Sequence, residues 1–351
     1  MTSASINNEQ NMMGAISLAE STLVELVRVE NLAKTFDVSP PLLNRLLEGK
    51  PKAFVHAVDD ISFSIPKGKT LALVGESGCG KSTVARLLVG LYAPTKGKVV
   101  FDNADVAVTL RSDQASAKAL RKRMQMIFQD PYASLNPRWR VEQIIAEPML
   151  EHGIGANDQE RADKVAALLK SVGLAAVDAQ KYPHQFSGGQ RQRISIARAL
   201  ATKPEFLVCD EPTSALDVSV QAQVLNIMKD LQKELGLTYL FISHNLAVVH
   251  HVADYVGVMY LGRLVELAPK HELFSNPRHP YTRMLLDAIP DINMTGRART
   301  PVQGEVPNPL NPPSGCAFNP RCPQATDRCK SERPELRDIS VAKVSCHLTS
   351  A

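Results

Sequence analysis

The nonapeptide Gly75-Glu76-Ser77-Gly78-Cys79-Gly80-Lys81-Ser82-Thr83 matches the pattern G-x-x-x-x-G-K-[ST] of a loop that binds nucleotide phosphates. An apolar run at 71–74 precedes it and an apolar-periodic segment at 84–89 follows it, so the predicted order is strand, glycine loop, helix. Glycines let successive N–H groups face phosphate oxygens, and the helix start adds the positive end of its dipole. Lys81 can reach the terminal phosphates, and Ser82 can offer its hydroxyl to Mg²⁺. A ligand-free glycine turn is the alternative, which the lysine, the serine and the strand–helix context disfavour.

Composition and length bound the class of protein. The chain has 351 residues, of which 44% are hydrophobic and 22% charged, which is ordinary for a soluble globular protein and enough for one large α/β domain with an appendage. A net charge of +4 with 5% aromatic residues gives no support for nucleic-acid binding. We find no apolar run that could span a bilayer and no signal peptide, so we expect a cytosolic protein or one held on a membrane by partners.

The pattern along the chain predicts three parts. Residues 1–20 are polar and are expected to form a disordered tail. Residues 21–268 alternate strand and helix signals, which predicts a doubly wound α/β core with a helical subdomain inserted at about 132–200. Near the start of this core, the pattern predicts a strand at 23–29, a loop at 33–36, a surface insertion at 40–52 and a strand at 57–65. From 269 to 351 proline becomes dense, which predicts a separate, loop-rich appendage.

Several predicted strands end in a polar residue, and ligands collect at that edge of an open α/β sheet. Asp210 and Glu211 follow an apolar strand, where a carboxylate can support magnesium and its neighbour can polarise an attacking water. His244 ends another strand and could hold that water and sense a γ-phosphate, and Gln129 could reach magnesium through its amide. Taken singly, the acidic pair could be a solvated strand end and the histidine could be structural.

The segment Ser187-Gly188-Gly189-Gln190 opens a helix and is a second potential anion-binding helix start. Because the core already has its own phosphate loop, this second helix start suggests that residues 187–190 bind a different nucleotide molecule. That in turn suggests a sandwich of two such domains with shared sites.

Together these segments resemble the ATP-binding cassette (ABC) family, in family order and over about residues 23–267. The P-loop core of that family with an inserted helical subdomain is therefore the expected fold. The similar segments are residues 75–83 (Walker A), Gln129 (Q-loop), Ser187, Gly188, Gly189 and Gln190 (signature), residues 206–211 (Walker B with the catalytic glutamate), Ser214, Ala215, Leu216 and Asp217 (D-loop), and His244 (switch histidine).

The resemblance also implies the site. In the family, the signature of one subunit closes over the ATP of the other, and an aromatic ring stacks on adenine. Phe36 is the candidate for that ring and Phe54 the alternative, because the insertion at 40–52 blurs the alignment. The implied catalytic residues are Lys81, Gln129, Glu211 and His244; Mg²⁺ would be held by Ser82, Gln129 and Asp210; and ATP would be bound by these together with Phe36, Gly75, Glu76, Ser77, Gly78, Cys79, Gly80 and Thr83.

The C-terminal segments 277–282, 304–307 and 311–316 resemble the appendage of dipeptide and oligopeptide importer ATPases. The resemblance implies an ATPase that powers peptide uptake from the cytoplasmic face of a bacterial inner membrane. Its implied partners are a second ATPase subunit, two membrane permease subunits and, indirectly, a peptide-binding protein. The alternatives are another cargo (nickel, glutathione or an antimicrobial peptide) or a soluble cassette protein acting on nucleic acid or ribosomes, which a single cassette without long coiled-coil inserts disfavours.

The last segment holds four of the chain's six cysteines: Cys316, Cys322, Cys329 and Cys346. The segment has little apolar content, so a metal could supply cohesion, and four thiolates suit zinc or an iron–sulfur cluster. The spacing C-x5-C-x6-C-x16-C does not fit the close pairs of structural zinc sites. The resemblance to the importer subgroup implies a [4Fe–4S] cluster, with zinc or free thiols as alternatives and His347 as a possible substitute ligand.

Overall fold

The computed structural model describes residues 24–41, 45, 51–288 and 304–349. The predicted tail at 1–20 and most of the predicted insertion at 40–52 lie outside the described residues. Within the described ranges, no helix combines the length and the apolar character needed to cross a bilayer.

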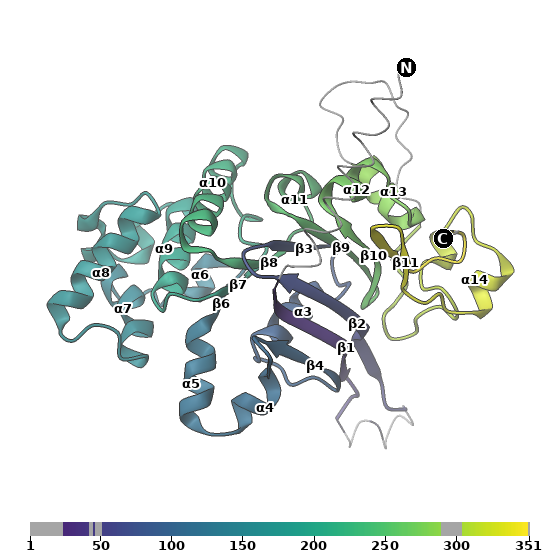
Figure 1. Cartoon of the computed structure of the whole chain (residues 1–351), viewed down its shortest axis with the longest axis horizontal. Helices are drawn as coiled ribbons and strands as arrows, with labels where there is room; N and C mark the ends of the chain where they lie inside the picture. The colour runs from purple at the N-terminus through teal and green to yellow at the C-terminus, as the bar shows by residue number, and fades with distance from the viewer. Residues whose placement is uncertain (1–23, 42–44, 46–50, 289–303, 350–351) are drawn as a thin grey trace.

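The larger of two sheets carries the phosphate loop (Figure 1). Its order in the described residues is β11-β12-β10-β9-β3-β8-β7-β6, and the neighbours from β9 to β6 pair in parallel. The strands β3, β7 and β8 are buried along their whole length and mostly apolar, as expected of parallel strands that are covered on both faces. The bounds are β3 Thr70–Val74, β6 Met124–Ile127, β7 Phe206–Asp210, β8 Thr238–Ile242, β9 Tyr255–Tyr260, β10 Arg263–Pro269, β11 Arg337–Ile339 and β12 Ala342–Val344.

A second, antiparallel sheet in the order β2-β1-β4-β5 lies beside the first. Its strands are β1 (Glu25–Asp37), β2 (Phe54–Pro66), β4 (Lys96–Phe101) and β5 (Ala104–Asp105). The predicted loop at 33–36 is wrong: these residues continue β1, because they pair with β2 as far as Asp37 and Phe54. The predicted doubly wound core is likewise wrong in this part, where the strands form a separate antiparallel sheet.

Helix α3 (Lys81–Leu88) follows the phosphate loop and packs between the two sheets (Figure 1). Val84, Ala85 and Leu88 are buried there in one core with residues of β1, β2 and β8. Helices α4 (Val106–Arg111) and α5 (Gln114–Arg123) contribute Val106 and Leu120 to this core, whereas α11 (Leu246–Val252) packs in the other two cores. The helix that presents Lys81 and Ser82 is therefore fixed on two sides.

A lobe of helices extends from the end of the larger sheet at which β6 lies (Figure 1). Val165, Leu169 and Val172 are buried in a core that also includes residues of β7 and β8. The inserted helical subdomain is thus confirmed as a helical lobe. Its elements are α6 (Pro131–Ser134), α7 (Val141–Glu151), α8 (Asp158–Ser171), η1 (Ala176–Gln180), η2 (Pro183–Gln185) and α9 (Gly188–Leu200), and α10 (Val218–Leu235) packs against α9.

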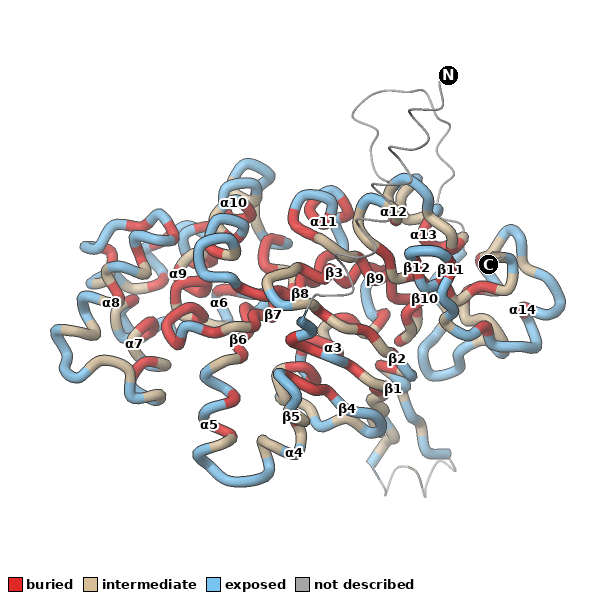
Figure 2. Tube along the Cα trace, viewed as in Figure 1, coloured by how far each residue is buried: buried red, intermediate tan, exposed pale blue. Residues whose placement is uncertain are grey.

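The C-terminal appendage joins the opposite edge of the same sheet. Strand β12 pairs antiparallel with β10, so that Val344 lies opposite Glu266, and β11 pairs with β12. Tyr281 and Phe318 are buried against Tyr260 of β9 in a common core. Figure 2 shows the buried stretches of β9 and β10 beside the appendage. The division at 268–269 stays a prediction; the structure adds that both parts share a sheet and a core. The other elements here are α12 (Lys270–Ser275), α13 (Pro280–Asp287), η3 (Asn319–Arg321) and α14 (Asp327–Ser331).

Candidate active site

A cavity of about 570 Å³ opens at the carboxyl ends of β3, β7 and β8. This is the edge at which ligands of open α/β sheets bind. The residues that line it are Val55, His56, Ala57, Ser77, Gly78, Gly80, Lys81, Ser82, Thr83, Gln129, Glu211, His244, Leu261, Gly262 and Pro309. Residues that lie far apart in the sequence therefore meet around one space, beside the phosphate loop.

Two glycines of the phosphate loop hold positions that no other residue fits. Gly75 has φ +147°, and an added Cβ would lie 2.2 Å from the carbonyl oxygen of Met259. Gly80 has φ +106°, and its Cβ would lie 2.1 Å from the carbonyl oxygen of Ala57. The loop is thus pressed between β9 and β2, which fixes where its N–H groups lie.

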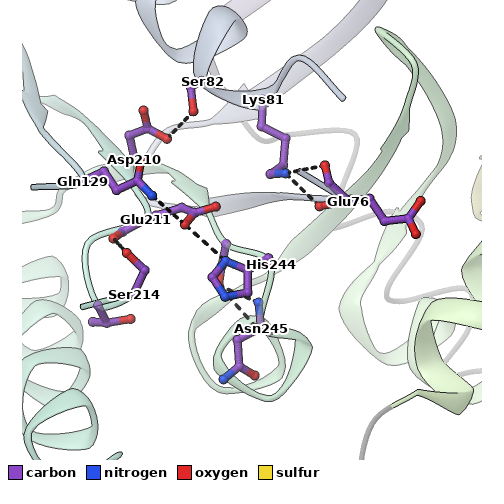
Figure 3. Close-up of polar contacts among 12 residues, drawn as sticks. Glu76, Lys81, Ser82, Gln129, Asp210, Glu211, Ser214, His244 and Asn245 are labelled. Carbon is purple, nitrogen blue, oxygen red and sulfur yellow. Dashed lines mark hydrogen bonds and ion pairs between the residues drawn. The ribbon is translucent and has the colours of Figure 1, made fainter. Parts of the chain in front are cut away.

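Lys81 and Ser82 begin α3 and reach two different walls of the site (Figure 3). The Lys81 ammonium donates to the carbonyl oxygens of Gly75 (2.7 Å) and Glu76 (3.0 Å). The Ser82 hydroxyl donates to the Asp210 carboxylate at 2.9 Å, although 128 residues separate the two. Burial raises the pKa of Asp210 above its ordinary value. A hydroxyl and a nearly buried carboxylate form an oxygen donor set of the kind that Mg²⁺ prefers.

Glu211 joins the ends of three elements. Its carboxylate accepts from the Gln129 amide at 3.1 Å and lies 3.1 Å from Nδ1 of His244 (Figure 3). Its backbone N–H donates to the carbonyl oxygen of Ile242, which ties the end of β7 to that of β8. Glu211 also has φ +46°, a left-handed conformation that costs free energy for a non-glycine residue. The strand-end residues predicted from the sequence therefore converge on one carboxylate.

The signature segment lies elsewhere. Ser187 caps α9, where its hydroxyl accepts from the Gln190 N–H while the Gln190 side chain accepts from the Ser187 N–H. A Cβ at Gly189 would lie 2.2 Å from Val220 of α10, so this glycine permits the close approach of the two helices. A Cβ at Gly188 would contact Leu216 of the predicted D-loop at 3.6 Å. Residues 187–190 are absent from the described lining of the cavity.

The predicted D-loop follows the site directly. Ser214 donates from both its backbone N–H and its hydroxyl to the carbonyl oxygen of Glu211, at 3.2 and 3.1 Å. Asp217 then occupies the N-cap position of α10. Residues 214–217 therefore connect Glu211 to the helix that packs against the signature helix.

The two aromatic residues proposed for adenine stay predictions. Phe36 packs edge-on against Tyr92, with ring centroids 5.5 Å apart. Neither Phe36 nor Phe54 is among the described residues that line the cavity, whereas His56 is. His56 was not predicted from the sequence, because it carries no motif, although an imidazole also has a flat π face.

Three residues of the appendage also reach the site, and none of them was predicted from the sequence. Pro309 lines the cavity, and Tyr281 and Arg321 contact Glu76 of the phosphate loop. More than 200 residues separate these partners from Glu76, so no local pattern could have indicated the contacts.

The four C-terminal cysteines lie near one another. All are free thiols, and the Cys316 N–H donates to the carbonyl oxygen of Cys329 at 2.8 Å. Burial is the main reason that the pKa of Cys316 rises to about 11, and the neighbouring thiols add to it. Among the residues that the structure describes, however, no group of three Cys, His, Asp or Glu side chains is placed to hold a metal ion. The donor chemistry suits a four-thiolate group, whereas the present arrangement does not assemble one.

This chain is similar to known proteins over most of its length. A family model described as ABC transporter matches residues 58–214, and one described as oligopeptide/dipeptide transporter, C-terminal region, matches residues 265–329. The oligopeptide transport ATP-binding protein AppF of Bacillus subtilis is 49% identical over 94% of this chain and 98% of its own length. The di/tripeptide transport ATP-binding protein DppF of Pseudomonas aeruginosa is 50% identical over 92% of this chain and 97% of its own.

A solved structure shows the same fold. The dimeric ATP-binding cassette MJ0796, in a post-hydrolysis state bound to ADP and Pi, has a TM-score of 0.60 and 27% identity, and the match covers 70% of this chain and 98% of that one. The predicted cassette fold is therefore confirmed. The chain belongs to the ABC transporter ATPases of the oligopeptide/dipeptide importer type.

Proposed function

We propose that this chain binds and hydrolyses ATP at the cavity beside residues 75–83 and that the hydrolysis powers peptide import. The convergence of Lys81, Ser82, Gln129, Glu211 and His244 on one cavity carries the proposal. The relatives that are named as peptide transport ATP-binding proteins support the cargo class.

The positions of these side chains suggest a separate role for each of them. Lys81 and the loop N–H groups would bind the terminal phosphates, and Ser82, Asp210 and Gln129 would hold Mg²⁺. Bound Mg²⁺ supplies charge that offsets the negative charge on the phosphates. Glu211 would orient and polarise the attacking water, because its carboxylate lies at the cavity wall between Gln129 and His244. His244 would hold the γ-phosphate.

Replacing Glu211 with Gln tests this assignment. The amide keeps the size of the side chain but cannot accept a proton, so ATP should still bind while turnover falls by about 10²–10⁴-fold. Phosphate release measures turnover, and equilibrium titration measures binding. Glu205→Gln, just before the opposite end of β7, is the matched control and should leave both unchanged. Undiminished hydrolysis in the Glu211→Gln variant would reject the role of Glu211.

A dimer would complete the site. Residues 187–190 lie away from this chain's own described cavity lining, which supports the idea that they serve the ATP of a partner ATPase subunit. The proposed complex is a heterodimer of ATPases bound at the cytoplasmic face of a bacterial inner membrane to two permease subunits, with a binding protein acting outside. Co-purification with integral membrane subunits would support this complex. Recovery on ribosomes would contradict it.

We propose dipeptides or oligopeptides as the cargo. Import of nickel, glutathione or an antimicrobial peptide would use the same ATPase chemistry, because the cargo crosses the membrane through other subunits. The identity of the binding protein that stimulates hydrolysis in the reconstituted complex would decide among them. Stimulation by a dipeptide-loaded binding protein is the expected result.

Cys316, Cys322, Cys329 and Cys346 are the proposed ligands of a [4Fe–4S] cluster, with zinc as the alternative. Their proximity and their four-thiolate chemistry support a metal site, but the described geometry does not assemble one. Anaerobically purified protein should absorb at about 400 nm if the cluster is present. A colourless protein fully loaded with zinc would reject the cluster.

A further inference from the structure

Glu76, the second residue of the phosphate loop, is held by an arginine of the C-terminal appendage. Arg321 Nη1 donates to Glu76 Oε2 at 2.7 Å, and Nη2 donates to Oε1 at 3.0 Å. The two residues are 245 positions apart in the chain. Two parallel bonds between a guanidinium and a carboxylate fix orientation as well as charge, which a single contact would not.

This ion pair is largely withdrawn from water. The Arg321 side chain is 2% exposed and that of Glu76 is 25% exposed. Arg321 also lies 5.8 Å from the ring centroid of Tyr260 and 6.0 Å from that of Phe318. The bond to Glu76 raises the pKa of Arg321 above its ordinary value. Loss of the Arg321 guanidinium would leave the Glu76 carboxylate without this counter-charge at a place where it is only 25% exposed.

A second residue of the appendage holds the backbone of the same loop position. The Tyr281 hydroxyl accepts from the Glu76 N–H at 3.0 Å, and Tyr281 itself is fully buried at the start of α13. The Glu76 carbonyl oxygen faces the other way and accepts from Lys81. The appendage therefore contacts both the side chain and the amide of Glu76.

The direction of the Glu76 side chain matters for a polyanionic ligand. Figure 3 shows its carboxylate pointing away from the Lys81 ammonium and from the cluster of Asp210, Glu211 and His244. A carboxylate that was free to turn toward the loop would repel phosphate oxygens in a site that binds them with N–H groups and one ammonium. Arg321 both neutralises this charge and keeps it turned aside.

We propose that Arg321 and Tyr281 are positioning residues of the ATP site. They hold the Glu76 carboxylate away from the phosphate loop, so that the phosphates of a nucleoside triphosphate can bind there. The inference rests on the proposed ATP site and adds that the appendage is a working part of it. Pro309, which lines the same cavity, places a third appendage residue there.

The main test is the ATP affinity of the full chain with Arg321→Gln. The unpaired Glu76 carboxylate should raise the Kd and KM for ATP about tenfold and change kcat much less. Adding Glu76→Gln should restore the Kd to within about threefold of wild type, because the charge that Arg321 neutralises is then gone. A purely structural role for Arg321 predicts no such rescue.

Arg333→Gln is the matched control. Arg333 also belongs to the appendage and also pairs with a cassette carboxylate, Asp59 at 3.2 Å, but that partner lies on β2 outside the phosphate loop. Its Kd for ATP should stay at the wild-type value. Should Arg321→Gln fail to fold, Arg321→Lys is used in the same cycle with Glu76→Gln; its single ammonium should give a smaller rise in Kd and the same rescue.

The outcomes separate this inference from the proposed function. A wild-type protein that binds no ATP would overturn the proposed function and this inference with it. A wild-type protein that binds ATP, together with an unchanged Kd in Arg321→Gln, would overturn the inference alone. A double variant as weak as Arg321→Gln would also overturn it, since Glu76 would not be the route of the effect.

Discussion

At the scale of single residues, the site is built from backbone constraints as much as from side-chain chemistry. Glu211 is held in a left-handed conformation by the bond from its N–H to Ile242, and its carboxylate is bracketed by Gln129 and His244. Such strain persists only where the surroundings enforce it, and it is concentrated at functional positions. The positions of these groups therefore support a role for Glu211 in the reaction.

His244 gives the prediction at this scale. Its side chain is 59% exposed and lies 3.1 Å from the Glu211 carboxylate, so replacing it with Ala should change the chemistry without unfolding the protein. We expect turnover to fall by about 10²-fold or more, because the contact with Glu211 and the proposed contact with the γ-phosphate are both lost. Phosphate release under saturating ATP measures the effect. His251→Ala, at an exposed position near the end of α11, serves as the control, and an equal loss there would contradict the prediction.

At the scale of elements, helix starts set several contacts. Helix α13 begins at a buried histidine: His279 is 1% exposed, and its Nδ1 accepts from the Tyr281 N–H at 3.0 Å. This cap places Tyr281, whose hydroxyl reaches the phosphate loop. The segment His279-Pro280-Tyr281, which matches no nucleotide-binding motif, thus connects the start of α13 to the ATP site.

The buried cap also predicts a pH dependence of stability. Burial lowers the pKa of His279 from 6.5 to about 3. Below pH 6.5 the unfolded chain therefore binds a proton on this histidine, whereas the folded chain does not bind it until about pH 3. The free energy of unfolding is therefore expected to decrease as pH falls from 6.5 to about 3. This residue should contribute a slope of about 1.4 kcal/mol per pH unit.

Urea unfolding of the wild type and of His279→Asn at several pH values below 6.5 measures the difference. Asparagine keeps an acceptor for the cap but takes up no proton, so its stability should depend less steeply on pH. Burial raises the pKa of the neighbouring Glu266, which has the opposite effect, and the comparison of the two proteins cancels it. Identical slopes in the two proteins would contradict the prediction.

At the scale of the whole molecule, the appendage is continuous with the cassette. Strand β12 extends the sheet beyond β10, and the rings of Tyr260, Tyr281 and Phe318 pack together with centroids 4.7–5.3 Å apart. Such ring clusters bury a large apolar area and add favourable edge contacts. The apolar residues of the appendage are too few for a core of their own and instead complete one started by the cassette.

Phe318→Ala tests this continuity. Phe318 is 1% exposed, so its loss should lower the free energy of unfolding by about 3–5 kcal/mol. Denaturant unfolding of the full chain gives the value. Leu310→Ala, in the same appendage but 41% exposed, should change stability by no more than about 0.5 kcal/mol. A Phe318→Ala protein as stable as the wild type would mean that the two parts fold independently.

The site was predictable wherever its chemistry lies at the end of a local pattern. Lys81, Glu211 and His244 each follow an apolar strand or a glycine loop, and parallel strands bring their carboxyl ends to one edge. The strand at 33–36 was mispredicted, because its residues form a strand by pairing with a partner about 20 positions away and not by their own periodicity. His56 and Pro309 carry no motif and are recognised only by the space that they line.

By itself, the sequence determined the family, the phosphate loop and the order of the predicted catalytic segments, because each of these depends on residue types at short, fixed spacings. Only the tertiary structure decided that Glu76 of that loop is paired with Arg321 and Tyr281, and that the C-terminal segment shares a sheet with the cassette. The physical reason is the separation in sequence between the residues that interact. A loop that cradles phosphate is specified by neighbouring residues, whereas a buried ion pair across 245 residues forms only when packing removes both partners from water.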